Sequence, residues 1–213
     1  MHFLSPLLES YITNSSEDEP KVLQELTRET HLKMIQPRML TGHFQGRVLS
    51  MLSKIMYPKY ILEIGTYTGY SALCLAEGMQ KDGALHTIDV NEELRSIQQK
   101  YFQKSEYGHA INAHTGDALA IIPTLDLIFD LVFIDAEKRS YPEYFEAALQ
   151  KTKPGSIILS DNVLWSGKVV EPLQPKDTAT KVLLDYNKKL KEDPRVETVL
   201  LPIRDGLTIS RVL

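Results

Sequence analysis

Residues 60–71 read YILEIGTYTGYS, and this stretch decides the fold class of the chain. An apolar run contains the acid Glu63, a turn bounded by Gly65 and Gly69 follows, and a helical pattern begins after it. A strand that passes through a glycine-punctuated turn into a helix is typical of the first unit of an open α/β sheet. Such sheets bind ligands beyond the carboxyl ends of their strands, so the turn marks a candidate binding site.

The same alternation of strand and helix patterns continues through most of the chain. Short apolar runs alternate with stretches whose apolar residues recur at helical spacing, and the links between them are short. This order predicts a mainly parallel sheet covered by helices on both faces, which is the α/β class. The predicted strands are residues 61–64, 85–89, 111–114, 131–135 and 156–160, and the predicted helices are residues 21–35, 43–56, 70–79, 92–105, 118–122 and 141–150.

The C-terminal residues 198–213, TVLLPIRDGLTISRVL, follow a different pattern. Two strand-like runs are joined by a short turn at residues 204–206, which is a hairpin signal. The sheet should therefore end in an antiparallel element. No repeat, low-complexity tract or linker divides the chain, so we expect one domain over residues 1–213, with residues 1–40 as an N-terminal helical segment.

Composition limits the kinds of protein that the chain can be. It has 213 residues, 43% hydrophobic and 24% charged, which is ordinary for a globular domain. The formal net charge of -4 disfavours a broad basic face for nucleic acid, although a local basic patch stays open. The single cysteine, Cys74, excludes an intramolecular disulfide, and we expect a buried thiol. The N-terminus lacks a basic leader and no apolar run reaches membrane-spanning length, so we expect a cytoplasmic protein.

The glycine turn indicates which cofactor the first strand serves. Its order is G-x-x-x-G, not the dinucleotide fingerprint G-x-G-x-x-G, and Tyr67 takes the place of the middle glycine. An acid also precedes the turn, where it could meet a cationic group. Both facts disfavour a nicotinamide dinucleotide and favour S-adenosylmethionine (SAM), which has no phosphate but carries an ammonium and a carboxylate. Glu63 could face the ammonium, and the helix N-terminus near Ser71 could receive the carboxylate.

The next two strand ends carry further candidate cofactor residues. Asp89 ends the second strand, where an acid usually accepts hydrogen bonds from ribose hydroxyls, and a solvated turn acid is the alternative. Gly116 permits a tight turn after the third strand. Asp117 and Ala118 would then lie at the adenine, while the alternative for Asp117 is the N-cap of the following helix.

A second group of acids follows the fourth and fifth strands. Asp135 ends one apolar run, with Lys138 close behind, and Asp161 and Asn162 end the next. In a parallel sheet these ends converge on one edge. Two carboxylates and an amide oxygen make a hard oxygen site that suits Mg²⁺, Mn²⁺ or Ca²⁺. The alternatives are a loop cap at Asp135 and a simple turn at Asp161 and Asn162.

Four motifs carry a resemblance to a known family: LEIGTYTGYSALCLA, HTIDVNEE, DLVFIDAEKRSYPEYFE and GSIILSDNVLWSGKV. In their order and spacing they resemble the cation-dependent O-methyltransferases, the group that contains catechol and caffeoyl-CoA O-methyltransferases and small bacterial relatives. The similarity runs from about residue 34 to the C-terminus. It implies the class I methyltransferase fold, a Rossmann-like, doubly wound sheet of seven mostly parallel strands with the last strand antiparallel. It also implies a homodimer.

The resemblance assigns expected roles to individual residues. Met39 and Thr41 would line the methionine and sulfonium end of SAM, and Lys138 would be the catalytic base or its electrostatic equivalent. The departures fall at His43, Phe44 and Gln45, where family members often carry acids or lysine, and they leave the acceptor open. The expected sets are Met39, Thr41, Glu63, Gly65, Tyr67, Ser71, Asp89, Asp117, Ala118 and Asp135 for the cofactor, Asp135, Asp161 and Asn162 for the metal, Lys138 and Asp135 for catalysis, and His43 and Trp165 for the substrate.

The chemistry explains why these groups belong together. Methyl transfer from a sulfonium is an in-line displacement, so the enzyme must supply a deprotonated, aimed oxygen nucleophile. Lys138 could take the proton or stabilise the anion, and a surface lysine at a helix start is the alternative. Trp165 could wall an aromatic acceptor, and a core or interface tryptophan is equally compatible with its position.

The sequence leaves four functions to be distinguished. The first is a SAM- and metal-dependent O-methyltransferase for a small aromatic vicinal diol of the catechol or caffeoyl type. The second keeps the chemistry and acts on a hydroxylated nucleoside in tRNA, which a basic patch around Arg139, Lys168, Lys176 and Lys181 would favour. The third is a nicotinamide-dependent oxidoreductase, and the fourth is a cofactor-binding protein without catalysis.

Overall fold

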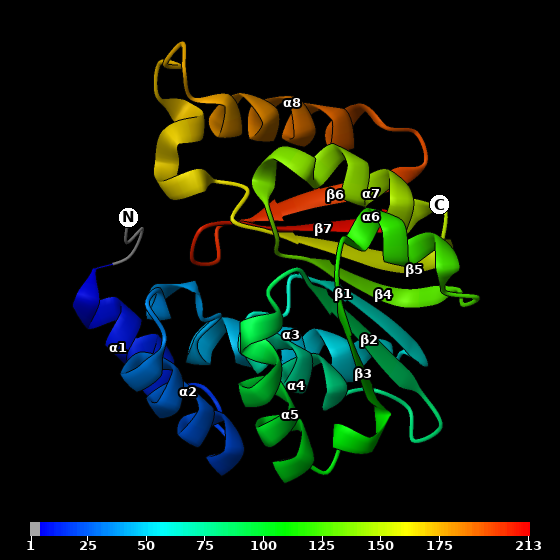
Figure 1. Cartoon of the computed structure of the whole chain (residues 1–213). Coiled ribbons are helices and arrows are strands. Elements are labelled where there is room, and N and C mark those ends of the chain that lie inside the picture. The colour runs from blue at the N-terminus through cyan, green and yellow to red at the C-terminus, as the bar shows by residue number, and fades with distance from the viewer. Residues whose placement is uncertain (1–4) are drawn as a thin grey trace.

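The computed structural model describes residues 5–213, and residues 1–4 of the predicted N-terminal helical segment lie outside the described residues. One seven-stranded sheet with the order β3-β2-β1-β4-β5-β7-β6 forms the centre (Figure 1). Strands β1 to β5 pair in parallel, and β7 pairs antiparallel with both β5 and β6. This confirms the predicted class I methyltransferase sheet. The strands are β1 (Tyr60–Ile64), β2 (Ala84–Asp89), β3 (Ile111–Thr115), β4 (Phe129–Ile134), β5 (Thr152–Asp161), β6 (Val196–Leu201) and β7 (Leu207–Val212).

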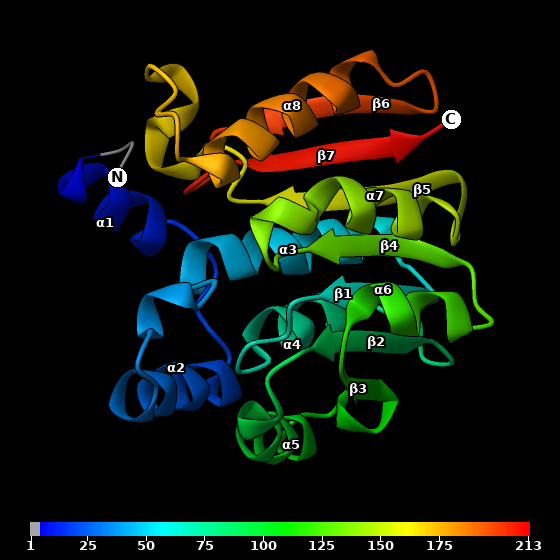
Figure 2. The ribbon, with the colours of Figure 1, turned by 45° about the horizontal axis from the view of Figure 1, so that its top comes forward.

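Helices cover both faces of the sheet (Figure 2). Alternate residues of each strand feed two cores: Ile61 packs with α2 to α5, and its neighbour Leu62 packs with α6 to α8. The helices are α1 (Pro6–Asn14), α2 (Lys21–Lys33), α3 (His43–Met56), α4 (Tyr70–Ala76), α5 (Arg95–Lys104), α6 (Ala118–Ile121), α7 (Tyr141–Leu149) and α8 (Thr178–Glu192). Short 3₁₀ turns are η1 (Pro37–Met39), η2 (Glu92–Leu94), η3 (Gly108–Ala110), η4 (Ile122–Thr124), η5 (Lys138–Ser140) and η6 (Trp165–Val170).

The predicted elements agree with the observed ones except at some ends. Helix α4 stops at Ala76, three residues before the predicted end. Gly78, a poor helix former, follows and packs on the Ser53 backbone, where a Cβ would lie 2.1 Å from an atom of α3. The predicted hairpin is present, and Arg204 and Gly206 both adopt positive φ in its turn. Cys74 is fully buried, as expected. Within residues 5–213, no helix is both long and apolar enough to cross a bilayer.

The register of the parallel strands builds one edge for a binding site. Ile64 is level with Ile88 on one side and Ile134 on the other, and Ile134 is level with Ser160. The residues that follow these positions therefore lie along one edge, which we call the carboxyl edge. We call the opposite edge, where the parallel strands begin, the amino edge.

Candidate active site

The glycine turn after β1 fits tightly against the end of β4. Gly65 adopts a φ of +99°, and a Cβ there would come within 1.9 Å of the Asp135 carbonyl oxygen. Gly69, at φ +93°, precedes α4, and a Cβ there would meet the Phe102 ring at 2.6 Å. Both positions require glycine because of conformation and space together. The turn and the first predicted metal residue are thus in direct contact.

Asp89 holds the glycine turn in place. Its Oδ2 accepts hydrogen bonds from the backbone N–H groups of Thr66 at 3.1 Å and Tyr67 at 2.7 Å, and its Oδ1 accepts one from Asn91 at 2.9 Å. A carboxylate has about four acceptor positions, so room remains for a ligand hydroxyl. The interpretation of Asp89 as a merely solvated turn acid is therefore wrong. Tyr67, at φ +47°, also donates its hydroxyl to the Gln36 carbonyl at 3.0 Å.

Glu63 lies beneath this turn and is fully buried on β1. Its Oε2 accepts a hydrogen bond from the Thr87 hydroxyl at 2.5 Å, whereas Oε1 has no aligned partner among residues 5–213. Burial raises the pKa of Glu63 to about 8, and the neighbouring hydroxyls of Ser71 and Thr87 oppose that rise. Ser71 is itself buried in the first turn of α4. A buried carboxyl with a free acceptor atom fits the ammonium group of SAM.

The remaining predicted cofactor residues lie on three separate segments. Asp117 is the N-cap of α6 and accepts a hydrogen bond from the Leu119 N–H at 2.9 Å, which is the alternative given for it above. Ala118 is buried beside it. Met39 is exposed at the end of η1, and Thr41 is buried just before α3.

An arginine from the C-terminal hairpin fixes the segment that contains Thr41. The Arg204 guanidinium donates to the backbone carbonyls of Leu40, at 3.2 Å, and Thr41. It also donates to the side-chain oxygen of Gln45 at 3.4 Å. No local pattern of the sequence indicates this contact, because it joins positions 163 and 164 residues apart.

The second acidic group forms a cluster around one lysine. Lys138 Nζ donates to Asp135 Oδ1 at 2.9 Å, and only 7% of the lysine is exposed, so the surface-lysine alternative is wrong. Asp161 is 2% exposed and accepts from the Asn162 N–H at 2.8 Å. Burial and the Asp135 charge raise the pKa of Asp161 to about 7, whereas Lys138 and the Gln45 amide act in the opposite direction. We call Asp135, Lys138 and Asp161 the carboxyl-edge cluster.

The oxygen donors of this cluster suit a hard cation. Asn162 directly follows Asp161 and adopts a φ of +56°, a conformation that asparagine tolerates better than most residues. Within residues 5–213, no three side chains of the histidine, cysteine, aspartate and glutamate types gather as a metal site. The absence of such a group among the described residues does not argue against a site built from Asp135, Asp161 and Asn162, because that site has only two carboxylates and its third ligand is an amide.

Tyr141 contacts the carboxyl-edge cluster, and sequence reasoning missed it. It is fully buried at the start of α7, and its hydroxyl accepts a hydrogen bond from Lys138 Nζ at 2.7 Å. The same hydroxyl lies 2.8 Å from the backbone carbonyl of Asp161. Its position three residues after Lys138 was the available signal, because residues i and i+3 lie on one side of a 3₁₀ turn.

The two predicted substrate residues have other contacts. His43 Nε2 lies 2.7 Å from the Glu17 carbonyl oxygen, in the link between α1 and α2. Trp165 is partly buried against the core beneath α6 to α8 and adopts a φ of +47°. The structure thus supports the core-packing alternative for Trp165.

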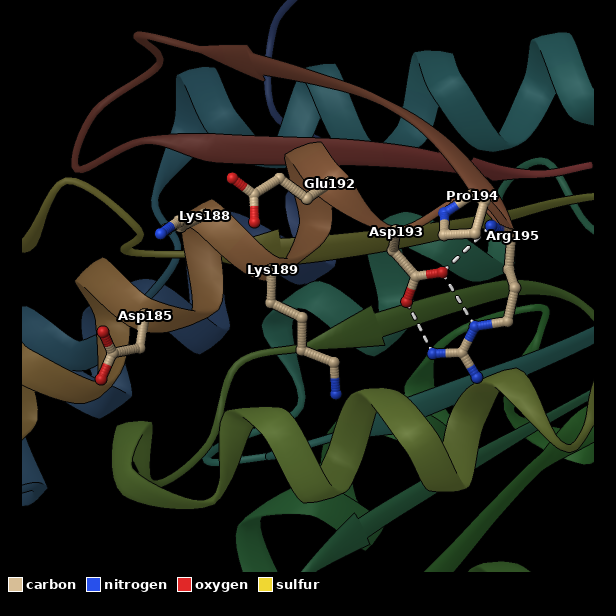
Figure 3. A pocket seen from close by; sticks show the side chains of 7 residues that line it. All are labelled: Asp185, Lys188, Lys189, Glu192, Asp193, Pro194 and Arg195. Carbon is tan, nitrogen blue, oxygen red and sulfur yellow. Dashed lines mark hydrogen bonds and ion pairs between the residues drawn. The ribbon is translucent and has the colours of Figure 1, made fainter.

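An open, charged hollow lies at the other edge of the sheet (Figure 3). Its lining residues come from the second half of α8 and the link to β6, and they are Asp185, Lys188, Lys189, Glu192, Asp193, Pro194 and Arg195. Val196, next to the hollow, pairs with Val212 at one end of β7, and Asp161 pairs with Leu207 at the other end. Asp161 lies at the carboxyl edge, so the hollow lies at the amino edge. Within the hollow, Arg195 is already paired with Asp193 at 2.6 Å. We assign the binding site to the carboxyl edge by topology and chemistry.

Comparisons with known proteins show the family of the chain. Residues 13–213 match the O-methyltransferase family. A caffeoyl-CoA O-methyltransferase of Petroselinum crispum is 36% identical over 97% of this chain and 91% of its own length. The crystal structure of the O-methyltransferase TomG from Streptomyces achromogenes, in complex with SAM, has a TM-score of 0.89 at 30% identity and covers 97% of this chain and 96% of TomG. An O-methyltransferase of Bacillus cereus in complex with SAH has a TM-score of 0.90 at 27% identity, with 97% of each chain covered.

The chain therefore belongs to the O-methyltransferase family. It is a SAM-dependent O-methyltransferase with the class I fold, as the motifs of the sequence predicted. The alternative of a nicotinamide-dependent oxidoreductase disagrees with this family and with the glycine turn described above.

Proposed function

We propose that this O-methyltransferase uses a divalent cation, held by Asp135, Asp161 and Asn162, to methylate a small aromatic acceptor with two adjacent hydroxyls. The observation that carries the proposal is the charge of the carboxyl-edge cluster. Two carboxylates, one of them only 2% exposed, share a single lysine. A buried carboxylate without a matching cation is costly, so the cluster favours a second positive charge.

The donor set supports a hard metal. Carboxylate and amide oxygens suit Mg²⁺, Mn²⁺ and Ca²⁺. A divalent cation held there would supply Lewis acidity and make an acceptor hydroxyl easier to deprotonate. The relatives named for caffeoyl-CoA support the acceptor class, because a caffeoyl group carries two adjacent phenolic hydroxyls.

The chain's own residues divide the work between the two halves of the carboxyl edge. In the cofactor half, the free Oε1 of Glu63 accepts the ammonium of SAM, Ser71 binds its carboxylate, and Asp89 uses its remaining acceptor position for the ribose. SAM supplies the methyl group on its sulfonium. In the other half, Lys138 Nζ lies beside Asp135, where it either takes the proton of the acceptor hydroxyl or stabilises the oxyanion that forms when that proton leaves.

A tRNA acceptor is disfavoured by the surface charges. The net charge is -4, and two of the four cations that could form a basic patch are already paired. Lys168 contacts Asp177 at 3.0 Å, and Arg139 contacts Glu137 at 3.9 Å. We therefore keep tRNA as an outcome of the experiment and not as a second proposal.

The test measures methyl transfer from labelled SAM to a panel of catechols and caffeoyl compounds and to bulk tRNA. Each acceptor is assayed with Mg²⁺, with Mn²⁺ and with EDTA. We expect label on a vicinal diol and loss of transfer with EDTA. Label on tRNA alone would contradict the acceptor class, and undiminished transfer in EDTA would contradict the metal.

A further inference from the structure

A buried hydroxyl lies against the carboxyl-edge cluster, on Tyr141 at the start of α7. We propose that the Tyr141 hydroxyl is a positioning residue that holds the Lys138 amine at the reacting end of the site. This inference rests on the proposed function of Lys138. It concerns how the lysine is aimed and not which acceptor is methylated.

The hydrogen bonds around the Tyr141 hydroxyl define its direction. A phenol has one proton to donate, and the nearer of two backbone carbonyls is that of Asp161 at 2.8 Å, with Ile134 at 3.2 Å. Because the proton goes to that carbonyl, the oxygen's lone pairs face the Lys138 amine, which donates to it at 2.7 Å. The hydroxyl therefore ties the lysine to the end of β5.

Lys138 needs such a tether because its side chain is long and flexible. A free lysine side chain samples many rotamers, and the amine keeps one position only when contacts fix it. Here the amine is fixed from two sides, by Asp135 at 2.9 Å and by the phenol, and it lies 4.8 Å from the centre of the Tyr141 ring. Without the phenol, Asp135 alone would hold the amine, and that carboxylate is also a proposed metal ligand.

The ring of Tyr141 is held rigidly, so the hydroxyl is a fixed reference point. The side chain is fully buried and packs edge to face on Tyr186, with 5.4 Å between ring centres and 78° between ring planes. Tyr186 is also fully buried, but its hydroxyl bonds Ser160 at 2.7 Å, away from the lysine. The two tyrosines are therefore a matched pair, since each offers one buried hydroxyl and only one of them contacts Lys138.

The experiment compares Tyr141→Phe with Tyr186→Phe. Each substitution removes one hydroxyl and keeps the ring, and melting temperatures report the structural cost of each. We expect Tyr141→Phe to lower kcat by roughly 10- to 100-fold, since a small misplacement of a reacting group can cost that much, with KM for SAM within about twofold of wild type. Tyr186→Phe should leave kcat within about twofold at a similar loss of melting temperature.

A double-mutant cycle with Lys138→Ala tests whether Tyr141 acts through the lysine. We expect Lys138→Ala and the double variant to be equally slow, because a missing amine cannot be misplaced. Two results would overturn this inference alone. One is a kcat of Tyr141→Phe equal to that of Tyr186→Phe. The other is a slow Lys138→Ala variant whose kcat falls further, by the full Tyr141→Phe factor, when Tyr141→Phe is added. Full activity of Lys138→Ala would overturn the proposed role of the lysine and this inference with it.

Discussion

Two charged clusters lie at opposite edges of the same sheet, and their charges are balanced differently. At the amino edge, Glu146 forms ion pairs with Lys189 at 2.6 Å and with Arg195 at 2.8 Å. Arg195 also pairs with Asp193 at 2.6 Å. Figure 3 shows Asp193 and Arg195 joined at this edge. We call these four residues the amino-edge cluster. At the carboxyl edge, Asp135 and Asp161 share Lys138 alone among the cations described above.

The direction of the pKa shifts follows this difference. Arg195, together with Lys189, lowers the pKa of Glu146 to about 2, so this carboxyl is well satisfied by its neighbours. Burial and a neighbouring acid raise the pKa of Asp161 to about 7, so the negative charge of this carboxyl is not balanced by its neighbours. Balanced clusters stabilise a fold, whereas an unbalanced buried one marks a place where a ligand completes the charge. The comparison therefore separates a structural cluster from a functional one within a single chain.

The largest predicted effect breaks the functional cluster. Asp161→Asn should lower kcat/KM by more than about 100-fold, because it removes a proposed metal ligand and keeps the side-chain shape. SAM affinity, measured by calorimetry, should stay within about twofold. The matched substitution Glu146→Gln at the amino edge should leave turnover unchanged. Equal loss of turnover in both variants would remove the distinction between the clusters.

The next prediction compares one glycine from each edge. Gly65 and Gly155 both have positive φ, but a Cβ at Gly65 would lie 1.9 Å from the Asp135 carbonyl oxygen, whereas at Gly155 it would meet no described atom within 4 Å. Gly155→Ala should cost about 1–2 kcal/mol of unfolding free energy, from conformation alone. Gly65→Ala should cost more than about 3 kcal/mol and abolish SAM binding, since backbone must move. Urea denaturation of both variants measures the difference, and equal costs would contradict the close packing at Gly65.

The third prediction concerns pH and the buried Glu63. Its pKa rises from 4.5 to about 8 on folding. Folding therefore binds a proton between these values, and this stabilisation is complete below about pH 4.5 and is lost as pH rises through 8. The loss is on the order of 5 kcal/mol for a shift of this size. Glu63→Gln should remove this dependence.

The measurement for Glu63 is the melting temperature of both proteins without SAM across pH 5 to 8.5. The curves should be close at the acidic end, and Glu63→Gln should melt higher at the basic end while binding SAM more weakly. Parallel melting curves would mean that Glu63 is not held as a neutral acid in the free protein.

The smallest effect is predicted for the amino-edge cluster. Glu146→Gln should lower the free energy of unfolding by about 1 kcal/mol or less at neutral pH, because the pairs are partly exposed to solvent. The lowered pKa of Glu146 means that its contribution is present above pH 4.5 and is lost as pH falls toward about 2. Denaturation in high salt should reduce the difference from wild type, and a salt-independent cost would indicate that packing and not charge is involved.

The sequence predicted the positions at strand ends much better than the contacts between them. Glu63, Asp89 and Asp161 lie where the apolar runs and the parallel order require, since short, largely buried strands and short links leave little freedom. The hairpin at residues 204–206 followed from its turn residues. Local pattern was sufficient for these features.

Other parts of the site depend on contacts that no local pattern encodes. Arg204 reaches the segment around Thr41 across most of the chain, and the Tyr141 hydroxyl meets Asp161 only because α7 packs on the end of β5. Asp89 turned out to bind the backbone of the glycine turn, a contact between two strand ends. These are properties of the folded chain, because they arise where distant segments are brought side by side.

The most direct test of the central claim is Mn²⁺ binding by the intact protein, measured by calorimetry on wild type, Asp161→Asn and Glu146→Gln. We predict one Mn²⁺ per chain for wild type and Glu146→Gln, and binding weakened by more than about tenfold for Asp161→Asn. Equal Mn²⁺ binding by all three proteins, or none by wild type, would contradict the assignment of the carboxyl-edge cluster as the metal site.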